Sequence, residues 1–325
     1  MVLTVGVRVP CYRRWCGPIE ARAIAQAAEE LGFGSLWVQD HLVAPAGDAA
    51  TTVVRGLDPW LAPEVEPTPP KTAAEYYASD DWWLDPFAMW GFLAAATTTV
   101  KLASDIVVTP YRHPIVQAKL LGTLDVLSQG RMILGSGSGH VPGESRALGL
   151  DFDARGRLHD EQLRAVVALL THDEVTFEGE FFRFGPVRTL VRPVQQPHPP
   201  IWVGGHGRRA LRRAAELGDG WLPSMLEPDA MARGIDALRA ACDGAGRADL
   251  PTLALSLPSR VRLPTAGRPE GANPPTPIDE VVTLLRRYES LGVEHVALGL
   301  PMPSVDVYLA QIETFAREVL PALRP

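Results

Sequence analysis

Residues 199–221 contain a segment that could bind an anion. A short apolar run leads through Gly204 and Gly205 directly into a helical pattern that starts near Gly207. Glycines let the backbone approach a ligand closely, and the first N–H groups of a helix point outward at the positive end of its dipole. An ordinary tight turn between a strand and a helix would have the same sequence. The segment therefore predicts either a phosphate site or such a turn, and His206 either donates to the phosphate or lies in solvent.

The pair Asp40-His41 follows another apolar run and could perform acid–base chemistry. Imidazole titrates near neutral pH, and a neighbouring carboxylate can orient it. A simple loop cap would use the same residue types, so the pair does not by itself predict a catalytic site.

Eight apolar runs alternate with helical patterns, which is typical of a parallel sheet with helical crossovers. The predicted strands are Thr4–Val9, Ser35–Gln39, Leu102–Thr109, Met132–Gly135, Ile201–Gly204, Gly220–Pro223, Thr252–Leu257 and Val293–Gly299. The helices are expected to begin near Pro18, Asp85, Pro114, Asp153, Gly207, Pro228, Ile278 and Val305. Eight such repeats predict an α/β fold, a closed (β/α)8 TIM barrel.

Polar and glycine residues follow four neighbouring predicted strands, the second to the fifth. These strands end in Asp40-His41, in Ser104-Asp105-Ile106, in Gly137-Ser138-Gly139-His140 and in Gly204-Gly205-His206. Reactive groups of such barrels gather at the carboxyl ends of the strands. Four adjacent clusters on one rim favour a ligand-binding surface over a chance arrangement. The run Gly135–Gly139 lacks the third glycine spacing of a dinucleotide fingerprint, so a Rossmann fold is rejected.

Three segments interrupt the repeat and are predicted as insertions within a single domain that spans residues 1–325. They are residues 43–83 after the second strand, 141–153 after the fourth, and 173–199 before the fifth. The first contains the aromatic residues Trp60, Tyr76, Tyr77, Trp82 and Trp83, which favours a cover over an apolar substrate pocket. The third has alternating runs around Glu178-Gly179-Glu180, which predict a β-hairpin.

Composition excludes several classes of function. A net charge of −7 disfavours a nucleic-acid-binding protein, which needs a basic face. The 46% hydrophobic content supports a large core, and the longest apolar stretch is too short to span a bilayer. Three cysteines and an N-terminus without a secretory pattern are consistent with a cytoplasmic protein.

Several blocks together resemble the luciferase-like monooxygenase superfamily, and within it the branch of oxidoreductases that depend on coenzyme F420, a deazaflavin. The blocks lie in residues 25–41, 107–119, 124–131, 177–182 and 200–221. The likeness is carried by Ala28-Glu29, Leu31-Gly32-Phe33, Asp40-His41, Thr109-Pro110-Tyr111-Arg112-His113-Pro114, Leu127-Ser128, Gly130-Arg131, Phe181-Phe182, Trp202-Val203-Gly204-Gly205 and Gly218-Asp219-Gly220-Trp221. The ordered set is specific, whereas each block alone is not.

The resemblance implies a flavin or deazaflavin at the barrel mouth, with its phosphate near Gly204 and Gly205. It implies a cis peptide bond between Asp105 and Ile106 that bulges against the ring. The remaining roles that it implies are ribityl contacts from Ser138 and Gly139, a hydrogen bond from Asp40 to the cofactor, and acid–base work by His41. Ser104, His140 and His206 complete the expected cofactor surface, and family members are often homodimers.

Two residues depart from the family pattern. Asp105 stands where small residues are common, and His140 stands where some sugar-phosphate dehydrogenases of the family have a glutamate. Either change could alter proton transfer or exclude that substrate, so a sugar phosphate is not favoured.

The leading hypothesis is hydride transfer between F420 and an unsaturated or carbonyl-bearing small molecule, with His41 handling the proton. One alternative is an FMN-dependent monooxygenase that uses oxygen and a partner flavin reductase. Another is a metal-dependent hydrolase with Asp40, His41, His140 and His206 as ligands, although no paired-histidine motif supports it and no metal is expected. A third is a barrel that binds a ligand without turnover.

Overall fold

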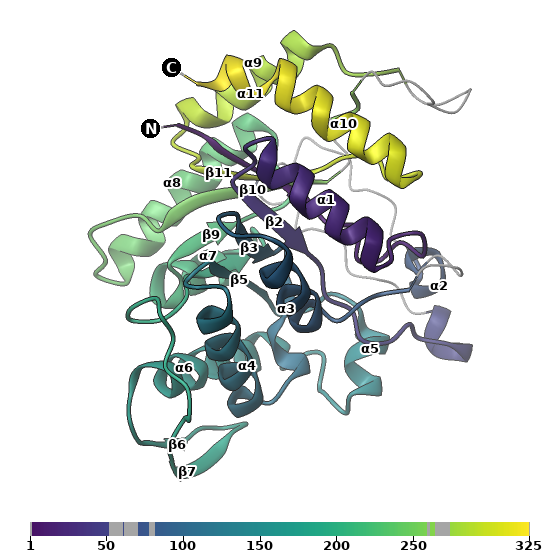
Figure 1. The fold of residues 1–325 in the computed structure, drawn as a ribbon. Coiled ribbons are helices and arrows are strands. Elements are labelled where there is room, and N and C mark those ends of the chain that lie inside the picture. Colours follow the sequence, from purple (N-terminus) through teal and green to yellow (C-terminus); the bar gives the residue numbers. More distant parts are fainter. Residues whose placement is uncertain are drawn as a thin grey trace.

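The computed structural model describes residues 2–51, 61, 71–77, 82–258, 261–263 and 274–324. Within these ranges the chain folds into a ring of strands surrounded by helices (Figure 1). The short helices α2 (Ala73–Tyr76) and α5 (Pro142–Ala147) lie together at one end of the ring.

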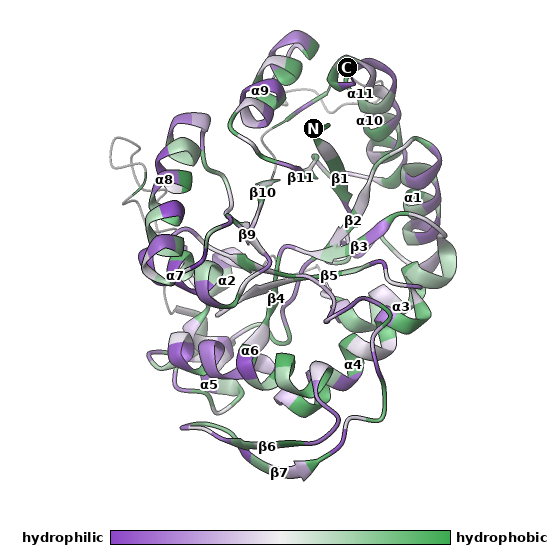
Figure 2. Ribbon diagram, turned by 90° about the vertical axis from the view of Figure 1, so that its left-hand side faces the viewer, coloured by the Kyte–Doolittle hydropathy of each residue, from purple (hydrophilic) through white to green (hydrophobic). Residues whose placement is uncertain are grey.

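Eight parallel strand positions, all among the described residues, close into a barrel (Figure 2). They are β1 (Thr4–Arg8), β2 (Ser35–Val38), β3 (Lys101–Ser104) with its continuation β4 (Val107–Val108), β5 (Met132–Gly137), β8 (Ile201–Gly204), β9 (Gly220–Leu222), β10 (Thr252–Pro258) and β11 (His295–Gly299). Strand β1 pairs with β11, and β3 pairs with β5, so the sheet has no free edge. The predicted (β/α)8 TIM barrel is confirmed.

Helices cover the outside of the ring, and each predicted helix start lies within two residues of the observed one. The long helices are α1 (Pro18–Glu30), α3 (Pro86–Ala96), α4 (Pro114–Leu127), α6 (Arg155–Thr171), α7 (Arg208–Leu217), α8 (Pro228–Gly244), α9 (Ile278–Ser290) and α10 (Val305–Glu318), followed by the short α11 (Leu320–Leu323). Four of them begin with proline, whose fixed φ suits a first turn and whose missing N–H costs nothing there.

The third predicted strand, residues 102–109, is interrupted. The peptide bond between Asp105 and Ile106 is cis, as the family resemblance implied. Strand β3 pairs with β2 up to Ser104, and β4 pairs with the end of β5 from Val107 onward. The interruption therefore lies at the rim, where the candidate site residues gather.

The barrel interior is filled by side chains. Its central layer consists of Trp37, Ala103, Ile133, Trp202, Leu222, Ala254 and Ala297. The rings of Trp37 and Trp202 lie 5.9 Å apart. His295 contacts both rings, and burial lowers its pKa to about 3, so this imidazole is neutral. A ligand must therefore bind at an end of the barrel.

The predicted insertions contain short elements of their own. Residues 141–153 include α5, which the sequence pattern did not predict, and residues 173–199 include the predicted hairpin of β6 (Val175–Glu178) and β7 (Arg183–Val187). The carboxylate of Glu161 on α6 accepts three backbone N–H groups from residues 180–182 and holds the hairpin tip. In residues 43–83, positions 52–60, 62–70 and 78–81 lie outside the described residues, and so does Trp60. The single-domain boundaries stay a prediction.

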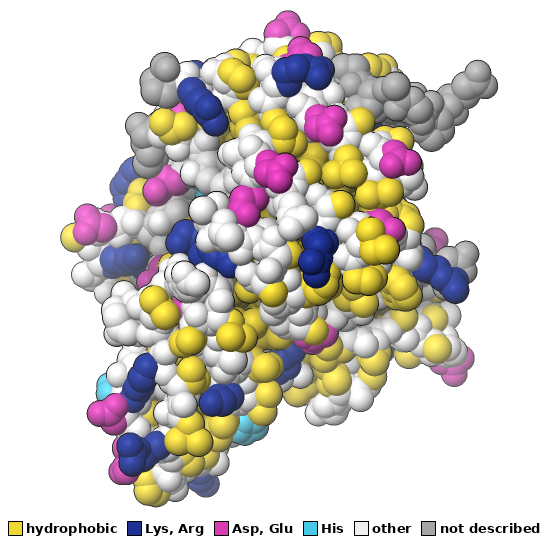
Figure 3. Space-filling view, in the orientation of Figure 1, with side chains coloured by type: hydrophobic (Ala, Val, Ile, Leu, Met, Phe, Trp, Pro, Cys, Tyr) yellow, Lys and Arg dark blue, Asp and Glu magenta, His cyan; other side chains and the backbone are white. Residues whose placement is uncertain are grey.

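Charge is distributed without a basic face on the side of the molecule that Figure 3 shows, because Lys and Arg alternate there with Asp and Glu. Within the described ranges, none of the helices is both long and apolar enough to cross a bilayer. The expectations of no nucleic-acid partner and a cytoplasmic location stay predictions.

Glu29 at the end of α1 fastens the turn that precedes β3. Its carboxylate accepts backbone N–H groups from Thr98, Thr99 and Val100 at 2.5 to 2.9 Å. Partial burial raises its pKa, but these hydrogen bonds outweigh that effect and hold the pKa at about 2. Because this pKa lies below that of a glutamate in the unfolded chain, the bonds stabilise the fold at neutral pH and lose their effect as the pH falls from 4.5 towards 2.

We therefore expect Glu29→Gln to lower the melting temperature at neutral pH and to flatten its decline between pH 4.5 and 2. Thermal unfolding followed by circular dichroism measures both effects. Glu30→Gln, at an exposed position on the same helix, is the control and should follow wild type. Equal acid sensitivity of Glu29→Gln and wild type would contradict the assignment.

Candidate active site

The carboxyl ends of β2, β4, β5 and β8 meet at one rim, and Ile106 forms its floor. A Cβ atom on Gly137 would lie 2.6 Å from Ile106 Cδ1, and one on Gly204 would lie 2.8 Å from Ile106 Cγ2. A larger residue at either position would have to displace the Ile106 side chain. Ile106 also packs on the inner apolar layer, so it separates the filled barrel from the mouth. The structure thus brings three of the predicted clusters together.

Backbone lines the rim beside this floor. Gly139 has a φ of +82° and Gly205 has a φ of +93°, both in the left-handed region that favours glycine. A Cβ on Gly139 would lie 2.9 Å from Val108 Cγ1. Gly205 is followed by the buried His206 and by α7, which begins directly after Gly207. Gly204 and Gly205 thus lead into the start of a ten-residue helix, a form that a phosphate site and an ordinary turn share, and the anion site stays a prediction.

Ser138 and His140 flank Gly139 and are half-buried, whereas Ser104 is fully buried. Ser104 donates its hydroxyl to the carbonyl of Gly135 at 2.8 Å. Its contribution to the rim is therefore a connection between β3 and β5.

Asp40 is buried and forms a two-pronged ion pair. Arg112 Nη1 and Nη2 donate to its two oxygens at 2.7 and 2.9 Å, and the Val108 N–H donates to Oδ2 at 2.9 Å. Arg112 also pairs with Asp85. Burial raises the pKa of Asp40, and Arg112 opposes that rise. Asp40 thus fixes the start of β4, and its predicted hydrogen bond to a cofactor stays a prediction.

His41 lies beside a carboxylate that the sequence did not point to. Its Nδ1 is 2.9 Å from Glu144 Oε2, and its Nε2 is 3.3 Å from the hydroxyl of Tyr76. Since Glu144 can only accept when ionised, Nδ1 carries a proton, and Nε2 is the ring nitrogen that can accept one. The imidazole is buried at 6% exposure.

Glu144 is fully buried and accepts several further hydrogen bonds. The Leu42 N–H donates to Oε1 at 2.6 Å, and the hydroxyls of Tyr111 and Tyr77 donate to Oε2 at 2.9 and 3.1 Å. Burial raises the pKa of this carboxyl, but the hydrogen bond and charge of His41 and the other donors outweigh it, so the pKa lies below its ordinary value. Glu144 is therefore ionised and stabilises a positive charge on His41.

Aromatic rings enclose His41. The ring of Trp83 meets it edge to face at 4.6 Å between centroids, and Tyr76, Tyr77 and His140 lie within 5.7 Å. Burial, with a smaller effect from His41, lowers the pKa of His140 to about 4, so His140 is neutral at physiological pH. Three aromatic residues of the first predicted insertion thus cover the candidate catalytic residue.

Asp105 points into the barrel and forms a buried cluster with residues of two distant strands. Arg8 at the end of β1 donates from Nε to Asp105 Oδ2 at 2.7 Å and contacts the same oxygen through Nη2. Ser256 of β10 donates to Oδ2 at 2.8 Å and accepts from Arg8 Nη2 at 2.9 Å. Burial raises the pKa of Asp105, and the charge of Arg8 opposes the rise. This cluster joins the carboxyl-end regions of β1, β3 and β10.

A metal-dependent hydrolase would need a set of metal ligands. In the part of the chain that the structure describes, no three His, Cys, Asp or Glu side chains lie together so as to hold a metal. Asp40 is paired with Arg112, and His41 with Glu144. Cys11, Cys16 and Cys242 are buried free thiols.

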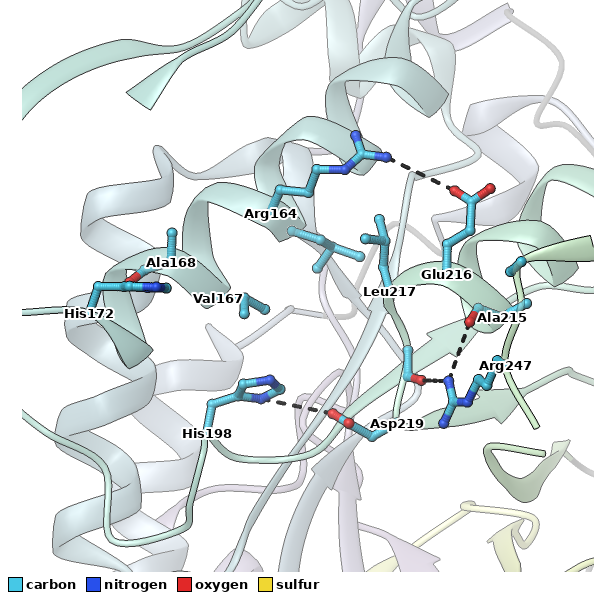
Figure 4. Close-up of a pocket in the computed structure, with 13 residues that line it drawn as sticks. Arg164, Val167, Ala168, His172, His198, Ala215, Glu216, Leu217, Asp219 and Arg247 are labelled. Carbon is cyan, nitrogen blue, oxygen red and sulfur yellow. Dashed lines mark hydrogen bonds and ion pairs between the residues drawn. The ribbon is translucent and has the colours of Figure 1, made fainter. Parts of the chain in front are cut away.

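A cavity of about 830 Å³ lies elsewhere, between α6, α7 and the connection from α8 to β10 (Figure 4). His198 and Asp219 in its wall precede β8 and β9, so it is at the amino ends of the strands. Its charged groups pair with one another or with backbone, as His198 does with Asp219 and Arg247 with the Gly218 carbonyl. This cavity is therefore not the candidate active site.

Sequence reasoning missed Glu144 and Arg8. Glu144 lies 103 residues from His41 in a segment interpreted as an insertion, and only an acid in the first turn of a helix marked it. Arg8 interrupts the apolar run Thr4–Val9, and a charge within a buried strand requires a buried partner.

A protein-family model matches most of the chain. The model for the luciferase-like monooxygenase family matches residues 17–263. An uncharacterized protein of Mycobacterium tuberculosis is 29% identical over 294 residues, which is 87% of this chain and 96% of that protein.

Two further relatives carry functional descriptions. An FMNH2-dependent dimethylsulfone monooxygenase of Pseudomonas putida is 33% identical over 159 residues, 48% of this chain and 44% of its own. The solved structure of an F420-dependent secondary alcohol dehydrogenase in complex with an F420-acetone adduct superposes with a TM-score of 0.76 and covers both chains completely, at 19% identity. At that identity, the likeness shows the fold.

Proposed function

The chain belongs to the luciferase-like monooxygenase family and is an enzyme of the oxidoreductase or monooxygenase type, and from that membership we propose that it is an F420-dependent oxidoreductase. The proposed reaction transfers a hydride between the deazaflavin and an unsaturated or carbonyl-bearing small organic molecule. The observation that carries the proposal is the His41–Glu144 pair, because hydride transfer to a carbonyl carbon requires a proton for the oxygen.

The residues at the rim fit a planar ring with a phosphate-bearing side chain. Ile106 offers an apolar floor, and Gly137 and Gly204 leave no side chain above it. The start of α7 after Gly205 suits the phosphate, and Ser138 and Gly139 suit the ribityl chain. When bound there, F420 supplies or accepts a hydride through its ring.

His41 holds or moves the accompanying proton at Nε2. Glu144 keeps the proton of Nδ1 in place and compensates the positive charge that His41 gains when Nε2 is also protonated. Trp83, Tyr76 and Tyr77 limit the access of water to this nitrogen. In this proposal the chain orients the cofactor, supplies or takes the proton at His41, and limits the access of water to that proton.

The FMN alternative rests on the Pseudomonas putida relative and would add a flavin reductase as partner. Parallel fluorescence titrations of the purified protein with F420 and FMN separate the two. Tight binding of F420 with weak binding of FMN is the expected result. Preferential FMN binding with oxygen uptake from reduced FMN would replace the proposal. Assembly as a homodimer, which the family resemblance implied, is checked on the same sample by light scattering.

Gly204→Ala tests whether the glycine floor holds the ring. The added methyl group would overlap Ile106 at 2.8 Å and displace it, so we expect F420 affinity to fall about tenfold. Gly244→Ala is the control, because among the described residues no atom lies within 4 Å of its added Cβ. If both variants bind F420 like wild type, the ring does not lie on this floor.

A further inference from the structure

We infer that Arg8 is a substrate-binding residue whose Nη1 donates a hydrogen bond to the carbonyl oxygen of a neutral substrate. The inference rests on the proposed function and narrows its substrate class to neutral carbonyl compounds. Three observations support it: a donor edge for which no described residue is an acceptor, an electrostatic effect on Tyr76 beside His41, and the pairing of the charged groups named below.

The guanidinium of Arg8 is held on one side only. Its Nε and Nη2 contact Asp105 and Ser256, and no described residue accepts a hydrogen bond from Nη1. The side chain is 8% exposed, so it is fixed in place yet not completely enclosed. A rigid, partly buried N–H donor offers a strong contact to an oxygen acceptor at little cost in side-chain entropy.

The charge of Arg8 acts on Tyr76, a residue that contacts His41. Burial raises the pKa of Tyr76 to about 12, and the charge of Arg8 is the strongest effect that opposes this rise. The same hydroxyl lies 3.3 Å from His41 Nε2. Tyr12 stacks on Trp83 with 4.9 Å between the ring centroids, and Trp83 packs on His41. Tyr76 is thus the side chain on which both the Arg8 charge and the His41 imidazole act.

The charges around the mouth disfavour an anionic substrate group here. Among the described residues, Arg8 is matched by Asp105, Arg112 by Asp40 and Asp85, and His41 by Glu144. Among the described residues, no group donates a hydrogen bond to the buried Asp105 Oδ1. The charge of this carboxylate is therefore compensated mainly by Arg8. A carboxylate on the substrate would meet these carboxylates, and the cations named here are already paired with them. A ketone, aldehyde, ester or amide needs only the donor that Arg8 offers.

The test uses three probes of similar shape: acetophenone, α-methylstyrene, in which a methylene replaces the oxygen, and benzoate. Binding to the full chain is titrated by ligand-observed NMR, with and without F420. We expect wild type to bind acetophenone about tenfold more tightly than α-methylstyrene, and benzoate most weakly.

Variants then assign the preference to Arg8. Arg8→Lys keeps the charge beside Asp105 but lacks the second terminal nitrogen, so acetophenone and α-methylstyrene should bind equally. The double variant Arg8→Met/Asp105→Leu removes the whole pair, which a fold tolerates better than an unpaired buried charge, and should behave likewise. Asp105→Asn leaves Arg8 uncompensated and should raise benzoate affinity about tenfold. Arg14→Lys, at an exposed position, is the control.

Several results would overturn the inference: no binding of acetophenone, equal binding of acetophenone and α-methylstyrene to wild type, benzoate as the tightest probe, or a preference that survives in both Arg8 variants. Failure of the proposed function gives a different result. If the protein does not bind F420, the relative affinities of the three probes for the cofactor-free protein still test the role of Arg8. Thermal unfolding confirms that each variant is folded.

Discussion

Replacement of His41 by alanine is expected to lower turnover about 10²- to 10⁴-fold while F420 affinity stays unchanged. The imidazole pairs through Nδ1 with Glu144, and among the described residues its Nε2 contacts only the Tyr76 hydroxyl, so its proposed role is proton transfer and not cofactor binding. Single-turnover oxidation of bound reduced F420 by a carbonyl substrate measures the first quantity, and fluorescence titration measures the second.

The matched control is His113→Ala, because His113 is an exposed residue that caps α4 away from the mouth. It should cost some stability but leave the single-turnover rate as it is in wild type. An unchanged single-turnover rate in His41→Ala would remove His41 from the mechanism. A parallel loss of F420 affinity would instead make it a cofactor-binding residue.

Glu144→Gln is expected to lower kcat about 10- to 100-fold with little change in KM. The amide keeps the volume, and its single oxygen can still accept from Leu42, but its NH2 group replaces the oxygen that accepts from Tyr111, and the neutral amide no longer compensates a positive charge on His41. Steady-state kinetics on the substrate that wild type accepts gives both constants. Tyr111→Phe removes one donor to the same carboxylate without touching the imidazole, and we expect only a few-fold effect, about that of a single neutral hydrogen bond.

A double variant separates a positioning role from a purely structural one. If Glu144 acts through His41, then His41→Ala/Glu144→Gln should be no slower than His41→Ala alone. Multiplying effects, together with a melting temperature well below that of wild type, would mean that Glu144 only supports the fold.

Repeats of apolar runs and helical patterns were sufficient to predict the barrel. The predicted Ile201–Gly204 strand matches β8 residue for residue, and the others differ at their ends by a few positions. Strand ends follow from local signals such as glycine, proline and charge, which the sequence displays directly. The break at Asp105-Ile106 was predicted from the family resemblance alone. The apolar pattern continues through these residues and does not indicate a break.

The candidate site was predicted less completely, because its polar partners come from separate elements. Asp40 and His41 were found as a pair, yet each bonds to a residue far along the chain, Arg112 and Glu144. Such pairings depend on how the barrel closes, which periodicity does not report. Arg8 gave a usable signal as a charge inside an apolar strand, but the identity of its partner required the structure.

The two tryptophans inside the barrel have a practical consequence for altering this enzyme. Since side chains fill the cylinder from within, its packing is separate from the segments that surround His41 at the carboxyl ends of the strands. The segments after β2 and β5 include α2 and α5, and among the described residues they contribute no side chain to the central layer. Specificity can therefore be redesigned by exchanging those connecting segments while the supporting scaffold is left as it is.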